Sequence, residues 1–321
     1  MLLLVAACCC LLLLAAVVLH VFVPFSLSPH NNQLIDVFLF LSLSSLFPFL
    51  SFLFFSPLHH HQAARDGDLS TLIQLIESGA YDVVRDVGPN GETGHHWAAG
   101  SGHLNVLVYL VEIGGVEGLT KRDQRSGRTV VHWASRNGHL SLLAAIKERW
   151  PSSLDVRMRT YDGTTSLHLA CYAGETATVE WLVGHGCDPN VCNNYGCNSI
   201  FFACIGGRYQ TSKFLYEECS VDVFAIQNQG HSALHKAAYT GSRDICAWLQ
   251  DVVGLDVNCT LEDAKGHTAS DLARMKGYLE LSLWLTRHCS SVVAEVAVVE
   301  EVLVEMVATE ESTSGSTKKI H

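Results

Sequence analysis

Histidine and cysteine are the side chains in this sequence best suited to chemistry, because they bind metals and act as bases or nucleophiles near neutral pH. The chain has 321 residues, of which 17 are histidine and 12 are cysteine. Their densest run has the spacing H-x-C-x4-C-x4-C and comprises His185, Cys187, Cys192 and Cys197. This spacing differs from that of paired-cysteine zinc sites, and the sequence has no phosphate-binding loop, dinucleotide fingerprint, kinase signature or nucleophile elbow. We therefore expect no catalysis, metal or cofactor, and the less favoured alternative is a metal- or thiol-dependent enzyme built on residues 187–204.

Most of the chain follows an internal repeat. Its frame is a glycine, six residues, an alanine, three residues and a second glycine, and it occurs six times with steps of 36, 36, 33, 34 and 36 residues. The first glycines are Gly91, Gly127, Gly163, Gly196, Gly230 and Gly266, and the second are Gly102, Gly138, Gly174, Gly207, Gly241 and Gly277. A partial seventh copy precedes them at residues 63–69. A fixed period of this length indicates a repeat architecture.

Each copy has the parts of a short helical unit. The first glycine suits the tip of an extended loop, where a positive φ is favoured. The Thr or Ser that follows can cap a helix, the alanine allows close helix packing, and the second glycine lets the chain reverse. Apolar residues at i, i+3, i+4 and i+7 then predict a second helix, as in residues 104–111. The unit is therefore loop, helix, turn and helix.

The residues around this frame resemble the ankyrin repeat signature, Thr-Pro-Leu-His-x-Ala in a unit of about 33 residues. The matching segments are Thr-Gly-His-His-Trp-Ala at 93–98, Thr-Val-Val-His-Trp-Ala at 129–134, Thr-Ser-Leu-His-Leu-Ala at 165–170 and Ser-Ala-Leu-His-Lys-Ala at 232–237. The resemblance covers residues 62–289 and implies an all-α ankyrin-repeat solenoid of about seven helix-turn-helix repeats with extended loop tips. It also implies that the signature histidines, His96, His132, His168 and His235, hydrogen-bond the loop backbone. Phe201 and Asp271 replace the histidine in two repeats, which leaves the capping of those helices open.

The resemblance implies a concave binding face whose variable positions flank the first glycine and precede the second. Here these positions include Arg125, Arg128, Arg136, Asn137, Tyr161, Thr164, Tyr172, Tyr195, His231 and Tyr239. Tyr and Arg are enriched at binding hot spots. We therefore expect a scaffold or adaptor that binds a protein partner there, and the alternative is that these residues are simply solvated.

Two neighbouring loops are basic. Lys121, Arg122, Arg125 and Arg128 lie in one, and Arg157 and Arg159 lie in the next. This pattern suits an acidic segment of a partner, with solvated loops as the alternative. The net charge of −11 argues against a nucleic-acid partner.

Residues 1–61 form an apolar N-terminal segment with one charged side chain, Asp36. Its uncharged runs, 1–19 and 37–58, are long enough for a signal anchor or membrane span. The first Lys or Arg after them is Arg65, and the positive-inside tendency then puts the repeats on the cytosolic side. The protein would in that case be a membrane-anchored sensor or tether. However, 21 of the 22 residues in the second run are Phe, Leu, Ser or Pro, which is the composition of a translated polypyrimidine tract, so partly retained intron sequence is the other interpretation. His61 is in register with the signature histidines, which allows the junction to lie a few residues earlier.

Residues 290–321 form an acidic tail rich in Val and Glu. Spacings of three and four between Val292, Val296, Val299, Leu303 and Met306 predict an amphipathic helix that caps the last repeat or meets a partner helix, with a disordered end after Thr309. The scattered cysteines of the repeats indicate free thiols in a reducing compartment. We expect a cytoplasmic monomer that is attached to a membrane only if the N-terminal segment is genuine.

Overall fold

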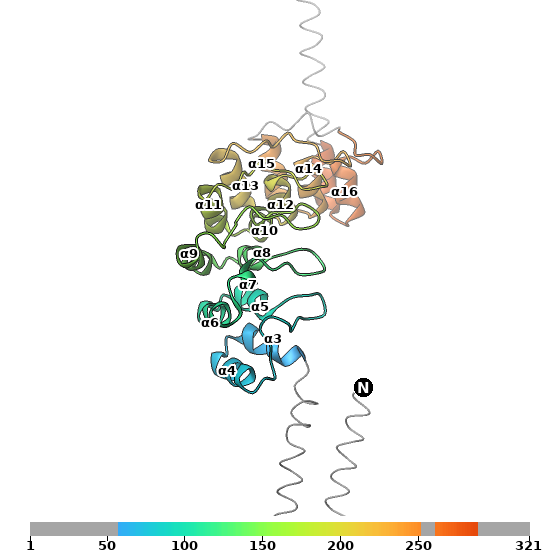
Figure 1. Cartoon of the computed structure of the whole chain (residues 1–321). Coiled ribbons are helices and arrows are strands. Elements are labelled where there is room, and N and C mark those ends of the chain that lie inside the picture. Colours follow the sequence, from blue (N-terminus) through green and yellow to red (C-terminus); the bar gives the residue numbers. More distant parts are fainter. Residues whose placement is uncertain (1–56, 252–260, 288–321) are drawn as a thin grey trace, which may run out of the picture. The chain divides into compact units, whose positions relative to one another are not determined.

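The computed structural model describes residues 57–251 and 261–287 (Figure 1). Within these ranges the chain forms helices and no β-strand, with one isolated antiparallel bridge between Arg159 and Thr165, so the predicted all-α class is confirmed. The compact unit that holds the repeats begins at Pro57, before the boundary that composition suggests at Gln62. Residues 1–56 and the predicted tail helix lie outside the described residues. In the described part, no helix combines the length and apolarity that a membrane crossing requires.

One helix of each repeat belongs to an inner row, and each inner helix packs on the next (Figure 1). The inner helices are α3 (Pro57–Asp66), α5 (Gly94–Ser101), α8 (Val130–Arg136), α10 (Ser166–Ala173), α12 (Ser199–Ile205), α14 (Ala233–Tyr239) and α16 (Ala269–Met275). Close packing is possible because the frame alanine is small and fully buried, as at Ala98, Ala134 and Ala170.

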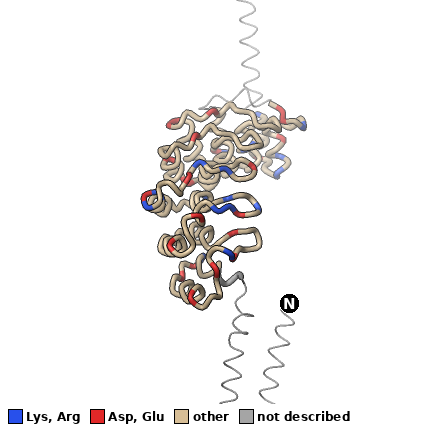
Figure 2. The backbone as a smooth tube through the Cα atoms, viewed as in Figure 1, with Lys and Arg blue, Asp and Glu red and all other residues tan. Residues whose placement is uncertain are grey.

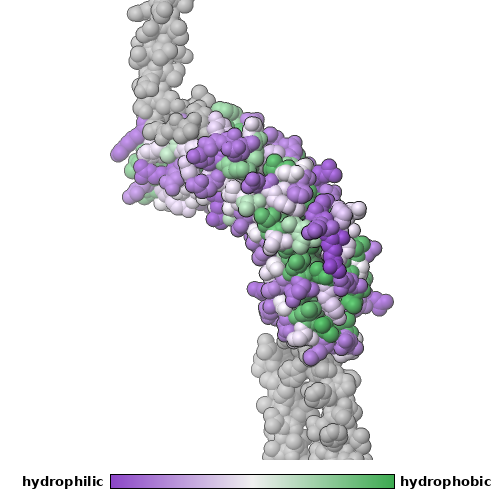
Figure 3. All heavy atoms as spheres, turned by 90° about the vertical axis from the view of Figure 1, so that its left-hand side faces the viewer, coloured by the Kyte–Doolittle hydropathy of each residue, from purple (hydrophilic) through white to green (hydrophobic). Residues whose placement is uncertain are grey.

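The second helix of each repeat belongs to an outer row. The outer helices are α4 (Leu69–Glu77), α6 (Leu104–Gly114), α9 (Leu140–Arg149), α11 (Thr176–Gly184), α13 (Tyr209–Glu217) and α15 (Arg243–Asp251). The short helix α7 (Glu117–Thr120) follows α6, and residues 279–287 are helical after α16. Figure 3 faces the outer row and shows hydrophobic residues most densely over its lower part, which holds the N-terminal repeats.

The core lies between the two rows. Leucines of the outer helices, such as Leu107, Leu142 and Leu182, are at most 1% exposed. Each such leucine contributes about 2 kcal/mol through burial. Because every repeat buries these residues against its neighbours, the core is continuous along the row.

The extended loops are joined edge to edge by backbone hydrogen bonds. Gln124 N donates to Asn90 O at 2.8 Å, Tyr161 N to Ser126 O at 3.0 Å and Asn194 N to Asp162 O at 2.9 Å. The series continues with Asn228 N to Tyr195 O at 3.0 Å and Ala264 N to Gln229 O at 2.9 Å. The twelve frame glycines all have positive φ, between 68° and 87°. At Gly127 a Cβ atom would also lie 2.8 Å from the Tyr161 ring, so a larger residue would disturb the loop contact.

Four inner helices begin with a capping box closed by the signature histidine. In α5, Thr93 N donates to His96 Nδ1 at 3.0 Å, and His96 Nε2 lies 3.1 Å from the carbonyl oxygens of Lys121 and Arg128 in the next loop. The equivalent boxes are Thr129 with His132, Thr165 with His168 and Ser232 with His235.

The two departures from the signature behave differently. Asp271 closes the same box, because Thr268 N donates to its Oδ2 at 3.1 Å. Phe201 is fully buried and makes no cap; instead the N-cap residue of α12, Asn198, donates through Nδ2 to Asp222 O at 2.8 Å. A carboxylate therefore replaces the imidazole at α16, whereas α12 uses a side-chain bond to the following loop.

Candidate functional site

Three adjoining hollows lie between the extended loops and the inner helices. The first, of about 410 Å³, is lined by Trp97, Trp133 and Arg125. The second, of about 340 Å³, shares Ser126 and Arg128 with the first. The third, of about 710 Å³, shares Ile205, Gln229 and Lys236 with the second. Shared walls make the hollows parts of one depression from α5 to α16, which we call the groove.

The N-terminal end of the groove, here the Trp end, consists of Trp97, Trp133, Arg125 and Arg128. The two indole rings meet edge to face with 5.2 Å between centroids, and the Arg65 guanidinium lies 5.6 Å from the Trp97 ring centroid. Both rings are half-buried, and neither indole N–H has a hydrogen-bond partner among the described residues. Paired aromatic rings beside arginines form the kind of surface that anchors binding partners.

Figure 2 marks the Lys and Arg positions of the basic loops in blue. These loops contribute fewer free cations than their composition suggests. Lys121 Nζ donates to Val84 O at 2.9 Å, Arg122 donates to the carbonyls of Gly127 and Arg159, and Arg159 donates to those of Gly163 and Cys192. Arg157 pairs with Asp155 at 3.6 Å. These four side chains hold neighbouring loops or pair locally, which leaves Arg125 and Arg128 facing the groove.

The carboxylates near the Trp end are engaged by their own loops. Asp123 accepts from the backbone N–H of Ser126 at 2.6 Å and of Gly127 at 3.0 Å, and Glu92 accepts from Asn90 N at 2.8 Å. Arg128 forms no ion pair with any described acidic residue. Burial lowers the pKa of Arg128, and repulsion from Arg136 acts in the same direction. The charges of Asp123 and Asp162 oppose these two effects without reversing them. The groove therefore presents a half-buried cation that forms no ion pair with a described residue.

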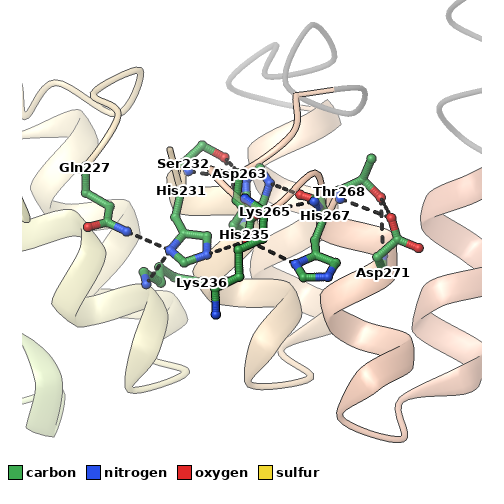
Figure 4. Close-up of polar contacts among 10 residues, drawn as sticks. All are labelled: Gln227, His231, Ser232, His235, Lys236, Asp263, Lys265, His267, Thr268 and Asp271. Carbon is green, nitrogen blue, oxygen red and sulfur yellow. Dashed lines mark hydrogen bonds and ion pairs between the residues drawn. The ribbon is translucent and has the colours of Figure 1, made fainter. Parts of the chain in front are cut away.

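The C-terminal end, here the His end, consists of His231, Lys236, Lys265 and His267. Figure 4 shows the rings of His231 and His267 on either side of Asp263. Asp263 accepts from His231 Nε2 at 3.1 Å, from His267 Nδ1 at 3.4 Å and from the backbone N–H of Lys265 at 2.8 Å. Desolvation opposes ionisation of this buried carboxyl, but its backbone and side-chain donors together hold the pKa well below its usual range. Asp263 therefore remains an acceptor for its own neighbours.

The structure places six of the ten predicted partner-binding residues along the groove: Arg125, Arg128, Thr164, Tyr195, His231 and Tyr239. Thr164 is only 5% exposed, so it contributes little surface. Tyr161 is 59% exposed on a loop tip outside the three hollows. Arg136 lies 6.0 Å from the Tyr172 ring centroid, and Asn137 donates to Gly100 O, so these three residues join neighbouring inner helices near their C-terminal ends.

The predicted site residues omit the residue that follows the signature-histidine position of each repeat. The groove is lined there by Trp97, Trp133, Leu169, Phe202, Lys236 and Leu272. A signal was present, because this position changes from aromatic to aliphatic to cationic, while the residue two positions before it is apolar or small in five of the six repeats and the frame alanine is the same in all six. Variable side chains beside invariant packing positions are typical of an exposed face rather than of the core.

The cysteine region offers little support for thiol chemistry. Burial raises the pKa of Cys187 to about 11 and that of Cys204 to about 12, so both thiols stay protonated at neutral pH. Cys192 is exposed, whereas Cys187 and Cys197 are buried. Within the described ranges, no three His, Cys, Asp or Glu side chains gather in a way that could hold a metal ion.

Comparison with known proteins identifies relatives of the repeats. The family model for ankyrin repeats (three copies) matches residues 60–149 and 145–225, more than half of the chain. The chain is 32% identical over 99 residues to NF-kappa-B inhibitor alpha of Homo sapiens, covering 29% of this chain and 31% of that protein. It is 30% identical over 124 residues to alpha-latroinsectotoxin-Lt1a of Latrodectus tredecimguttatus, covering 38% of this chain and 8% of the toxin. The chain thus matches less than a third of the length of either relative. The family match, the repeat spacing and the stacked helix pairs agree, and the chain belongs to the ankyrin repeat family.

Proposed function

We propose that the chain is a non-catalytic scaffold that holds an acidic segment of a protein partner along the groove. The observation that carries this proposal is that Arg128 and Lys236 are half-buried in the groove and form no ion pair with a described acidic residue. The nearby carboxylates of Asp123 and Asp263 accept hydrogen bonds from their own loops instead. A partly desolvated cation that forms no direct ion pair is unfavourable. An acidic partner segment would supply the missing charge and be oriented by it.

The rigidity of the repeats supports a binding role. The loops are bonded edge to edge, and capping boxes fix the starts of five inner helices. A surface fixed before binding loses less conformational entropy when a partner arrives. The aromatic pair at the Trp end would then act as an apolar anchor beside the arginines.

The relatives and the cysteines support two further parts of the proposal. One relative is named as an inhibitor of NF-kappa-B, which fits a role in binding rather than catalysis. The seven described cysteines are free, and five of them are buried. Buried free thiols suit a reducing compartment, so we place the repeats in the cytosol.

Titration of the full chain with a fluorescein-labelled octaglutamate peptide tests the proposal. Replacing Arg125 and Arg128 together by Glu should weaken binding by at least about tenfold, or ~1.4 kcal/mol. The matched control is Arg85→Glu with Lys213→Glu, which changes net charge equally at positions outside the groove. Equal losses in both double variants, or no binding of the peptide to the wild-type chain, would contradict the proposal.

A further inference from the structure

The two ring nitrogens of His231 have different partners. Nε2 lies 3.1 Å from Asp263 Oδ2, and the ionised carboxylate can only accept, so Nε2 carries the proton. In the neutral ring Nδ1 must then accept. Its single lone pair faces two donors, Gln227 Nε2 at 2.6 Å and Lys236 Nζ at 3.0 Å. His231 therefore holds the Lys236 ammonium through its one unprotonated nitrogen (Figure 4).

Two lysines line the third hollow, a third contacts one of its lining residues, and none of the three forms an ion pair with a described acidic residue. Lys236 is half-buried and Lys265 is exposed on the loop that carries Asp263. Lys276 lies 4.1 Å from the Tyr239 ring centroid, and Tyr239 lines the same hollow. Asp263 forms no ion pair with these lysines, because its oxygens accept from His231, His267 and backbone N–H groups. Its charge opposes the burial that lowers the pKa of Lys236, and the net effect on that pKa is still downward.

We propose that the His end is a proton-coupled carboxylate site, in which an acidic side chain of the partner enters the third hollow beside Lys236 and Lys265 while one proton from solvent binds Nδ1 of His231. The inference rests on the proposed function, because the carboxylate belongs to the bound partner. Protonated Nδ1 can no longer accept from Lys236 or from Gln227 Nε2, and a flip of the Gln227 amide turns its oxygen toward the new N–H. The ammonium therefore leaves the ring and faces the incoming carboxylate, and the imidazolium adds a second positive charge.

The surrounding groups favour this coupling. In the free protein, burial lowers the pKa of His231, and repulsion from Lys236 lowers it further, although Asp263 opposes both effects. A carboxylate in the hollow reverses the repulsion. The other titratable groups near the pair are committed elsewhere: His235 Nδ1 accepts from Ser232 N in the helix cap, Asp271 bonds Thr268 and Arg274, and Cys197 is a buried thiol whose pKa is raised by burial.

The proton dependence of peptide binding by the full chain tests the inference. Uptake of one proton changes affinity by at most about tenfold per pH unit, so octaglutamate should bind about threefold to tenfold more tightly at about pH 6 than at about pH 7.5. His231→Gln keeps a donor for Asp263 and an acceptor for Lys236 but cannot take up a proton, and it should remove most of this difference. His185→Gln, at an exposed position on the outer row, should behave like the wild type.

The peptide titrations separate loss of the proton-coupled site from loss of the binding groove as a whole. Binding that persists with the same pH dependence in His231→Gln would overturn the proton-coupled site and leave the scaffold intact, whereas no binding at either pH would overturn both. Circular dichroism at both pH values establishes that the variant is folded. If it is not, the His231 Cε1–H resonance of the wild type gives the answer, because its pKa must rise when octaglutamate is added and an unchanged pKa would reject the site.

Discussion

The two ends of the groove carry positive charge on different side chains. The Trp end uses arginines, which stay charged at every physiological pH, beside two packed indole rings. The His end uses lysines and histidines around one buried carboxylate. The difference teaches that a repeat scaffold can hold a constant anchor and an adjustable one in a single groove, because each repeat supplies its own lining residues.

The inner helices beneath the two ends also differ, in the number of histidines that they bury. The Trp end rests on α5 and α8, which bury His95, His96 and His132, whereas the His end rests on α14 and α16, which bury only His235 among the described residues. Desolvation lowers the pKa of His95 and of His132 to about 4. The charge of the side chains that line the Trp end therefore does not change with pH, whereas the helices beneath it lose stability in acid.

Acid should produce the largest difference between the two ends. A histidine whose pKa is lowered by folding stabilises the protein fully above its unfolded pKa of 6.5, and this contribution is lost as the pH falls from there to about 4. Each such group should cost roughly 2 to 3 kcal/mol of unfolding free energy by the end of that range. Hydrogen exchange at decreasing pH should show amides of α5 and α8 losing protection before those of α16. Loss of protection in all helices at the same pH would show that the two ends do not differ in acid sensitivity.

Truncation of one lining residue at each end should give the next largest difference. Trp133→Ala removes a half-buried ring that packs on Trp97 and should lower the unfolding free energy by about 2 to 3 kcal/mol. Lys236→Ala removes a side chain whose described partner is His231, and its effect should stay within about 0.5 kcal/mol. Urea denaturation of both variants measures the two values. Similar losses would show that the anchors are integrated into the core to the same extent.

Exchange of the capping residue should give the smallest effect. Asp271→His restores the signature histidine in α16, and because either side chain can accept from Thr268 N, stability at pH 7 should change by less than about 1 kcal/mol. The Asp271 side chain is 32% exposed, so a histidine there should add less acid sensitivity to α16 than the buried histidines give to α5 and α8. Hydrogen exchange of α16 below pH 6 measures this change, and a loss of protection as large as that of α5 and α8 would argue that burial of the signature histidines does not govern acid sensitivity.

Much of the fold is readable from the repeat frame, because the same glycine, alanine and cap positions recur and each has one physical role. The site is less readable. Arg122 and Arg159 look equivalent to Arg125 in the sequence, yet they bond loop carbonyls that lie close only after the repeats stack. Lys236 stands within the repeat signature, and its side chain lines the groove only because residues of the neighbouring repeats form the adjacent walls. The frame therefore predicts where a surface forms, and the stacking decides which side chains remain free on it.

A footprint of octaglutamate on the full chain tests the central claim most directly. Hydrogen exchange with and without the peptide should show protection around residues 90–133 at about pH 7.5, because the arginines are charged there. At about pH 6 the protected region should extend to residues 227–268, because protonation of His231 completes the His end. Protection confined to the outer helices, or a footprint that is the same at both pH values, would contradict the account.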